Sequence, residues 1–242
     1  MNWVLLRGLG RESRHWGDFV TVLKKSPSVG EVLALDLPGT GQRYRESSPA
    51  SVRGMAEKVR EEFLTKKGAG DWGVVGMSLG GMIAMEWAHR HPLDFARVVL
   101  INTSARGAGL PWQRMQPWAA RQLALIARTS DLEAKERLVL EMTAVDSQEW
   151  APQFAVFAQE RPIALTTSLR QLAAALAYEA PKAMSCPTRL LIGQRDRMVA
   201  PTCSQALATR WGAEINEHPT GGHDLALDDP QWTADQISSF GA

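Results

Sequence analysis

A serine stands at position 78 within the short sequence Gly76-Met77-Ser78-Leu79-Gly80, directly after an apolar run. The spacing matches G-x-S-x-G, in which a sharp turn from a strand into a helix lifts the serine hydroxyl above the sheet. The glycines leave room for that turn because they carry no Cβ atom. The serine would also begin a helix, where unpaired backbone N–H groups favour negative charge. The pattern therefore predicts that Ser78 is a nucleophile.

A serine hydroxyl is a weak nucleophile, so it needs a general base, an acid that orients the base, and hydrogen-bond donors for the developing oxyanion. Asp196 comes shortly after the apolar run 190–192, and His223 lies in a glycine-rich loop after the last strand-like segment. Parallel strands end at one edge of a sheet, where ligands bind in open α/β folds. We therefore expect Ser78, Asp196 and His223 to form a catalytic triad at that edge.

These assignments have plainer alternatives. His223 could be a solvated loop histidine, and Asp196 could be a surface acid paired with a neighbouring arginine. Asp224 is a rival acid, but its adjacency to His223 makes a bond to the imidazole ring awkward. The other histidines fall near the start of the chain, at the end of a helical segment or in a strand: His15, His89, His91 and His218. Only His223 combines the end of a strand with flanking glycines, which favours it as the base.

The elements that must position these residues alternate along the chain. Strand-like segments occur at residues 3–6, 31–35, 72–75, 97–101, 188–192 and 214–218. Residues 51–66 carry apolar side chains on one helical face, and the segment from Met82 to His91 is apolar on more than one side, as a buried helix would be. Such alternation favours an α/β fold with about six parallel strands and helices on both faces of the sheet.

The alternation stops after Asn102, and no convincing strand follows for about 80 residues. Helical patterns fill this stretch instead, at residues 111–128, 131–144, 150–159 and 163–179. We therefore predict a core made of residues 1–103 and 182–242, interrupted by a helical insertion at residues 104–181.

Composition narrows the classes of protein. The 242 residues are 45% hydrophobic and 22% charged, which suits one α/β domain with an insertion, and the formal net charge of +1 gives no reason to expect nucleic acid or a membrane surface. No apolar run reaches the roughly 20 residues of a bilayer span, and the first apolar run is too short for a signal peptide. Cys186 and Cys203 lack metal-ligand spacing and are too few for a disulfide framework. We expect a cytoplasmic monomer or weak homodimer with reduced thiols and no metal site.

Over nearly its whole length the chain resembles the α/β-hydrolase family. The matching segments are Arg7 to Gly10 after the first strand, Asp36 to Gly41 after the second, the turn at Ser78, Asp196, and Gly222-His223. The resemblance implies that the backbone N–H groups of Leu9 and Leu79 form the oxyanion hole, and that the insertion is a lid over the active site. Where the family usually has His-Gly after the first strand, this chain has Arg7-Gly8. We expect activity to survive that change, because Leu9 donates through its backbone.

Within the family, the short chain and its helical insertion are most similar to the pimeloyl-acyl-carrier-protein methyl ester esterase group. The resemblance implies a serine esterase that cleaves carboxylic esters through an acyl-enzyme without any cofactor, and it makes the methyl ester of a carrier-bound acid one candidate substrate. The same triad could serve a thioesterase, a perhydrolase, a C–C hydrolase or a lyase. A non-catalytic ligand-binding module is the alternative of another class.

The insertion carries two sets of residues that could recognise substrate. Its first part contains four arginines and no acid between residues 104 and 128, and these arginines are Arg106, Arg114, Arg121 and Arg128. Arg114 and Arg121 are our candidates for contact with an acidic carrier protein, although a solvated helix face is the plainer reading. The tryptophans of the insertion are Trp112, Trp118 and Trp150. They could line an apolar acyl pocket, or they could form the packing face of the helices.

Overall fold

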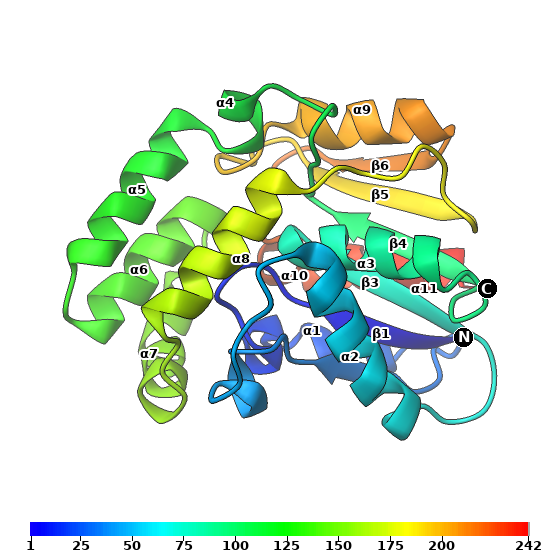
Figure 1. The fold of residues 1–242 in the computed structure, drawn as a ribbon, viewed down its shortest axis with the longest axis horizontal. Helices are drawn as coiled ribbons and strands as arrows, with labels where there is room; N and C mark the ends of the chain where they lie inside the picture. The colour runs from blue at the N-terminus through cyan, green and yellow to red at the C-terminus, as the bar shows by residue number, and fades with distance from the viewer. Residues whose placement is uncertain (242) are drawn as a thin grey trace.

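A six-stranded parallel sheet forms the centre of the molecule, in a computed structural model that describes residues 1–241. The strands lie in the order β2-β1-β3-β4-β5-β6. Their bounds are β1 (Asn2–Leu6), β2 (Val32–Leu35), β3 (Trp72–Met77), β4 (Arg97–Ile101), β5 (Thr188–Gly193) and β6 (Glu214–His218). All neighbouring strands pair in parallel. The predicted fold class is confirmed, and Figure 1 shows the sheet with its flanking helices.

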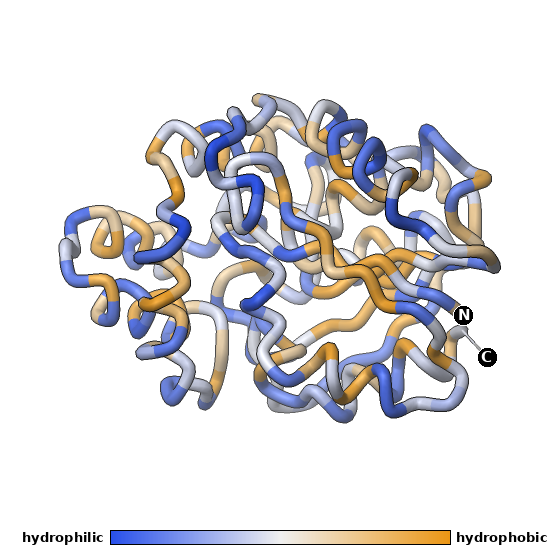
Figure 2. Tube along the Cα trace, turned by 90° about the horizontal axis from the view of Figure 1, so that it is seen from below, coloured by the Kyte–Doolittle hydropathy of each residue, from blue (hydrophilic) through white to orange (hydrophobic). Residues whose placement is uncertain are grey.

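Both faces of the sheet are covered by helices. One face packs against α2 (Val52–Lys66), α3 (Leu79–Arg90) and α9 (Pro201–Trp211), and the other against α1 (Phe19–Lys24) and α11 (Pro230–Phe240). Short helices occur at η1 (Ser13–Trp16), η2 (Gly41–Arg43) and α10 (Leu225–Asp228). Along β1 the side chains alternate, with Val4 and Leu6 in one core and Trp3 and Leu5 in the other. Figure 2 shows the hydrophobic residues concentrated in the strands.

The helical insertion lies between β4 and β5. It comprises α4 (Pro111–Arg114), α5 (Pro117–Arg128), α6 (Leu132–Thr143), η3 (Gln148–Trp150), α7 (Ala151–Glu160) and α8 (Leu165–Ala177). In Figure 1 these helices extend from the end of the molecule where the strands finish, opposite to the two termini. No helix within residues 1–241 is long and apolar enough to cross a membrane.

One boundary in the insertion differs from the prediction. Residues 111–128 were expected to form a single helix, but the helix breaks between Arg114 and Pro117. Gln116 is extended, with φ −64° and ψ 145°, and Pro117 starts the new helix at its first position. Proline disfavours helical geometry in the residue before it, so the break follows from Pro117. The prediction of one helix followed the hydrophobic periodicity and overlooked the effect of Pro117.

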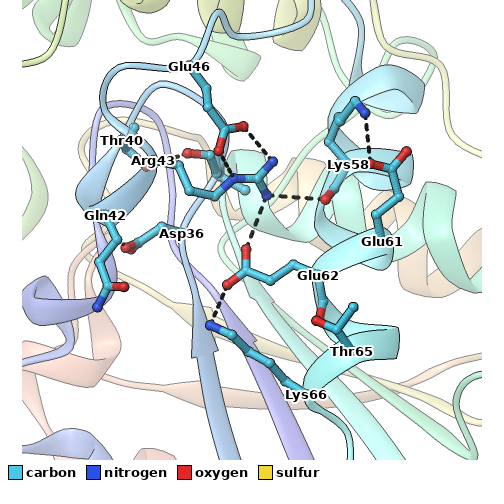
Figure 3. Close-up of polar contacts among 11 residues, drawn as sticks. Asp36, Thr40, Gln42, Arg43, Glu46, Lys58, Glu61, Glu62, Thr65 and Lys66 are labelled. Carbon is cyan, nitrogen blue, oxygen red and sulfur yellow. Dashed lines mark hydrogen bonds and ion pairs between the residues drawn. The ribbon is translucent and has the colours of Figure 1, made fainter.

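The loop after β2 is organised by an acid that the sequence places within the family motif. Asp36 accepts hydrogen bonds from the backbone of Ser13 at 2.6 Å and of Gln42 at 2.8 Å, so it ties the loop after β1 to its own loop. Next to it, Arg43 pairs with Glu46 at 2.7 Å and with Glu62 of α2 at 3.2 Å. Figure 3 shows this cluster of charges over α2. Such partly exposed pairs add little stability individually, but they fix where the loop lies.

Candidate active site

Ser78 occupies the turn between β3 and α3. Its φ of 54° and ψ of −117° lie outside the regions that L-residues favour, so the turn holds the serine in a strained conformation. The flanking glycines are required by close packing: a Cβ atom at Gly76 would lie 2.3 Å from the carbonyl oxygen of Gly80, and one at Gly80 would lie 2.2 Å from that of Leu6. The strand-turn-helix context expected of a nucleophile elbow is therefore present.

Asp196 and His223 come together at the carboxyl edge of the sheet. The loop after β5 carries Asp196, the loop after β6 carries His223, and His223 Nδ1 lies 2.7 Å from Asp196 Oδ2. The other carboxylate oxygen accepts the backbone N–H groups of Met198 and Val199 at 2.8 and 2.9 Å. Asp196 is thus locked in orientation, and it holds the proton of His223 on Nδ1. This arrangement leaves Nε2 able to accept a proton.

The environment of His223 changes its basicity. Burial lowers the pKa of His223, because the charged imidazolium loses its hydration, and the nearby Arg7 guanidinium lowers it further. The charge and hydrogen bond of Asp196 oppose this effect, and Asp224 adds to the opposition. The carboxylates prevail, so the pKa of His223 is raised above its usual 6.5.

A buried asparagine that the sequence reasoning missed joins three strand ends. Asn102, directly after β4, donates from Nδ2 to the carbonyl oxygens of Gly222 and His223 at 2.9 and 2.8 Å, and its Oδ1 accepts from the N–H of Gly193 at 2.8 Å. Its φ is 45°, a left-handed conformation that asparagine tolerates better than most residues. An asparagine at a strand end was the only signal available in the sequence. The bonds fix the backbone that carries His223.

Ser78 and His223 are not joined directly. Within residues 1–241 no hydrogen bond links the Ser78 hydroxyl to the imidazole, and the two residues line different cavities. Ser78 borders a cavity of about 40 Å³, whereas His223 borders one of about 760 Å³. Met198 lines the first and Met142 the second, and both methionines belong to one apolar cluster. The smaller cavity has room for little more than water in this conformation.

The two proposed oxyanion donors border the same small cavity as Ser78. Leu79 is the first residue of α3, and Leu9 lies in the loop after β1. Among the described residues, no acceptor is hydrogen-bonded to either backbone N–H. The loop that carries Leu9 is held by α8, since Gly10 donates to Gln171 Oε1 at 3.0 Å. Two unused donors beside a nucleophile are what an oxyanion hole requires.

Comparison with known proteins gives the family. Residues 3–236 match the alpha/beta hydrolase family. The chain belongs to this family. It is 31% identical to the pimeloyl-[acyl-carrier protein] methyl ester esterase of Chromobacterium violaceum, over 91% of this chain and 86% of the relative. A second esterase with that name, from Aromatoleum aromaticum, is 28% identical over 94% of this chain and 93% of the relative. The predicted resemblance is thereby confirmed.

Solved structures agree on the fold of this alpha/beta hydrolase. A 2-hydroxy-6-oxo-6-phenylhexa-2,4-dienoate hydrolase from Rhodococcus sp. strain RHA1 has a TM-score of 0.78 at 21% identity, covering all of this chain and 90% of the other. A bacterial membrane phospholipase A has a TM-score of 0.77 at 23% identity, covering 99% and 77%. At these identities the likeness establishes the fold alone.

The two arginines of the insertion that are candidates for carrier contact differ in their surroundings. Arg121 is exposed on α5, but the guanidinium of Arg114 donates to the carbonyl oxygens of Ala175 and Leu176 at 2.6 and 3.0 Å. Arg114 therefore closes the end of α8 and lines the Ser78 cavity, and its contact with a carrier protein stays a prediction. Carrier recognition at Arg121 stays a prediction.

None of the three insertion tryptophans lines either the Ser78 or the His223 cavity. Trp112 is 59% exposed, Trp118 packs beneath Arg197 at 3.8 Å, and Trp150 stacks on Phe154 at 5.6 Å. Trp118 also lines a third cavity, of about 570 Å³, together with Asp196. Trp112 and Trp150 fit the alternative role in surface and helix packing, and a pocket role for Trp118 stays a prediction. The insertion contributes other apolar residues to the walls of the two cavities, namely Leu125, Leu138, Met142, Val145, Leu172 and Leu176, and the core adds Leu9, Leu79, Met82, Met198 and Val199 to the Ser78 cavity.

The rival acid Asp224 takes a different part from Asp196. Both of its carboxylate oxygens accept from the guanidinium of Arg7, and neither contacts the imidazole of His223. This placement agrees with the expectation that Asp224 lies too close to His223 in the sequence to bond its imidazole ring. Nothing in the sequence indicates that Arg7 pairs with Asp224, because the two residues lie 217 positions apart.

Proposed function

We propose that this protein hydrolyses carboxylic esters through an acyl-enzyme formed on Ser78. The observation that carries the proposal is the buried Asp196–His223 pair, at 2.7 Å, on the same sheet edge as a serine in a strained, glycine-bounded turn. In this mechanism Ser78 Oγ attacks the ester carbonyl while His223 Nε2 takes its proton. His223 then gives the proton to the leaving alcohol. Water, deprotonated by the same nitrogen, cleaves the acyl-enzyme.

The oxyanion of each tetrahedral intermediate would accept hydrogen bonds from the Leu9 and Leu79 backbone N–H groups. Both groups border the Ser78 cavity, and neither has another partner among residues 1–241. Donors that are already fixed in place need no reorganisation when charge develops, which makes this the main electrostatic contribution. The first turn of α3 adds its helix dipole at Leu79.

The finer proposal concerns the acyl part of the substrate. The cavity of about 760 Å³ beside His223 is of the size that holds small-molecule ligands, and its walls include Leu125, Leu138 and Met142. An apolar acyl chain suits these walls. Together with the relatives that are named pimeloyl-[acyl-carrier protein] methyl ester esterase, the exposed Arg121 supports the methyl ester of an acid bound to an acidic carrier protein as substrate.

The test combines a substrate screen with chemical labelling. Purified protein is assayed against p-nitrophenyl esters of short, medium and long acyl chains, and against a methyl ester on an acyl carrier protein. A fluorophosphonate probe is then used, and the adduct is located by mass spectrometry. We expect ester hydrolysis and a single adduct on Ser78. Labelling of another residue, or no hydrolysis of any ester by protein that takes up the probe, would overturn the proposal.

A further inference from the structure

A buried ion pair between Arg7 and Asp224 lies beside the candidate site. Arg7 Nη1 donates to Asp224 Oδ1 at 3.1 Å, and Nη2 donates to Oδ2 at 2.5 Å. The two side chains are 2% and 3% exposed. Removing a guanidinium and a carboxylate from water is so unfavourable that an apolar pair of similar volume is often as stable. The placement of this pair therefore suggests a role other than stability.

The pair joins three of the four segments that the proposed mechanism uses, all except the loop after β5 that carries Asp196. Arg7 stands two residues before Leu9, and its Nη1 lies 3.6 Å from the sulfur of Met77, the residue before the proposed nucleophile. Asp224 directly follows His223. The loop after β1, the end of β3 and the loop after β6 thus meet at one guanidinium. A shift of any one loop against the others would break a contact of Arg7.

Further contacts fix both partners. The N–H of Asp224 donates to the carbonyl oxygen of Thr143, at the end of α6, at 2.7 Å, so the insertion is joined to the same point. The Arg7 guanidinium lies over the ring of Trp16 at 4.7 Å. Among the described residues, however, Arg7 Nε is buried without a hydrogen-bond partner.

The pair also decides which charges His223 experiences. The charged groups around the imidazole are Asp196, Asp224, Arg7 and Asp228 on the core side, and Arg137, Glu141, Arg195 and Arg197 around its cavity. Asp224 raises the pKa of His223 and Arg7 lowers it, so the two neighbours oppose each other. Loss of either partner would leave an uncompensated charge in a buried region.

We propose that Arg7 and Asp224 are positioning residues, which hold the Leu9 loop against the His223 loop and give the imidazole a neighbouring pair without net charge. The inference rests on the proposed function, because it assigns the pair to the base of that mechanism. Neither residue lines the Ser78 cavity or the His223 cavity.

The test measures the protonation of His223 directly, by NMR titration of its imidazole, in parallel with kcat/KM across pH. The variants are Arg7→Gln, Asp224→Asn and the double variant. Arg7→Gln leaves the negative charge of Asp224 alone, so both midpoints should move to higher pH by about one unit. Asp224→Asn leaves the positive charge of Arg7 alone, so both should move to lower pH by a similar amount. The double variant should titrate close to wild type.

Two further variants separate position from charge and from general stability. Arg7→Lys keeps the charge but loses the two-pronged bond, so the His223 midpoint should stay while kcat falls at least about tenfold with little change in KM. Arg189→Gln is the matched control. Arg189 is 8% exposed and pairs with Glu214 at 3.0 and 2.9 Å near the start of β5, at the opposite edge of the sheet. We expect no change in the titration of His223.

Each outcome is decisive. Shifts of the same sign in the two single variants, or lower thermal stability with unchanged titration and kcat, overturn the positioning role. If Arg7→Gln fails to fold, the comparison of Asp224→Asn with the double variant still isolates the loss of Arg7. The His223 midpoint should then be higher in the double variant than in Asp224→Asn. Opposite NMR shifts in a protein that hydrolyses no ester would uphold the charge balance and sink the proposed function. Normal ester hydrolysis without those NMR shifts would support the proposed function and overturn the charge balance.

Discussion

The sheet edge and the helical insertion both border the candidate site, but they hold their side chains in different ways. At the sheet edge, hydrogen bonds from backbone groups orient Asp196, and the side chain of Asn102 makes three bonds to the backbone of neighbouring loops. In the insertion, Leu138 and Met142 line their cavity through apolar contact only, and Arg137 pairs with Glu133 one turn away on the surface. Hydrogen bonds depend on direction and hold a side chain in one position, whereas apolar side chains that only pack against each other can rearrange. We infer that the edge performs the chemistry and the insertion selects the substrate.

The insertion is nevertheless fastened to the core. Arg11, in the loop after β1, pairs with Glu136 of α6, and both side chains are largely buried. Arg14 pairs with Glu160 of α7 at 2.5 Å and lies over the ring of Phe157 at 4.0 Å. These contacts fix one side of the insertion. Residues of α5 and the end of α6 line the large cavity on the other side, and it is there that substrate preference should respond to substitution.

The largest expected effect is at the nucleophile. Ser78→Ala should lower kcat/KM for p-nitrophenyl esters by at least about 10⁵-fold, because a triad without its serine retains only the contribution of binding and the oxyanion hole. The fluorophosphonate adduct should disappear as well. Ser238→Ala, on α11, is the control and should keep wild-type activity. Equal labelling of the Ser78→Ala protein would place the nucleophile elsewhere.

The second effect concerns the orientation of the base. Asp196→Asn should reduce kcat by about 10⁴-fold, since the amide NH2 group can donate to Nδ1 and favour the wrong His223 tautomer, and the neutral amide no longer stabilises the imidazolium. Asp94→Asn is a matched control: Asp94 pairs with Arg60 at 2.6 Å and accepts from Trp87, far from the strand ends that carry the triad. It should alter stability and leave the activity of folded protein unchanged. Comparable losses of activity in both variants would argue against the assignment of Asp196.

The difference between the two regions also explains what could be predicted from the sequence. Ser78, Asp196 and His223 could be predicted as candidates because each lies at a strand end, and strand ends meet wherever a parallel sheet forms. Asn102 and the Arg7–Asp224 pair were not found, because a contact across 217 positions leaves no local pattern. In the insertion, periodicity located the helices, but it does not fix how a helix is turned toward the core. The orientations of Arg114 and Trp150 could therefore not be predicted.

A third prediction tests the base through pH. His223 must be neutral to accept a proton, and its pKa is raised, so the imidazole becomes neutral only as pH rises past its shifted value. We therefore expect kcat/KM to increase with pH and to reach a plateau, with its midpoint above 6.5. Below the midpoint the rate should fall tenfold per pH unit. A flat profile from acid to neutral pH, with the protein still folded, would exclude His223 as the base.

A smaller and more selective effect is expected in the insertion. Leu138→Ala and Met142→Ala enlarge the cavity beside His223, so they should shift the preferred p-nitrophenyl ester toward longer or bulkier acyl chains, by about tenfold in the ratio of kcat/KM values. The rate with a short ester should change little, because the triad is untouched. Leu64→Ala, an exposed position on α2, is the control. Equal losses for all chain lengths would show that these side chains support the site rather than select substrate.

The smallest effect should come from the exposed charge on α5. If Arg121 contacts an acidic carrier, Arg121→Glu should lower kcat/KM for a carrier-bound methyl ester by about threefold to tenfold at low salt, and less at high salt, since ions screen exposed charges over about 10 Å at 0.1 M. Hydrolysis of small p-nitrophenyl esters should not change. Arg53→Glu reverses an exposed charge on α2, away from the insertion, and serves as control. If Arg121→Glu slows small and carrier-bound esters alike, its effect runs through the folding of α5. If it slows neither, the carrier contact has no support, and the insertion selects its substrate through apolar packing alone.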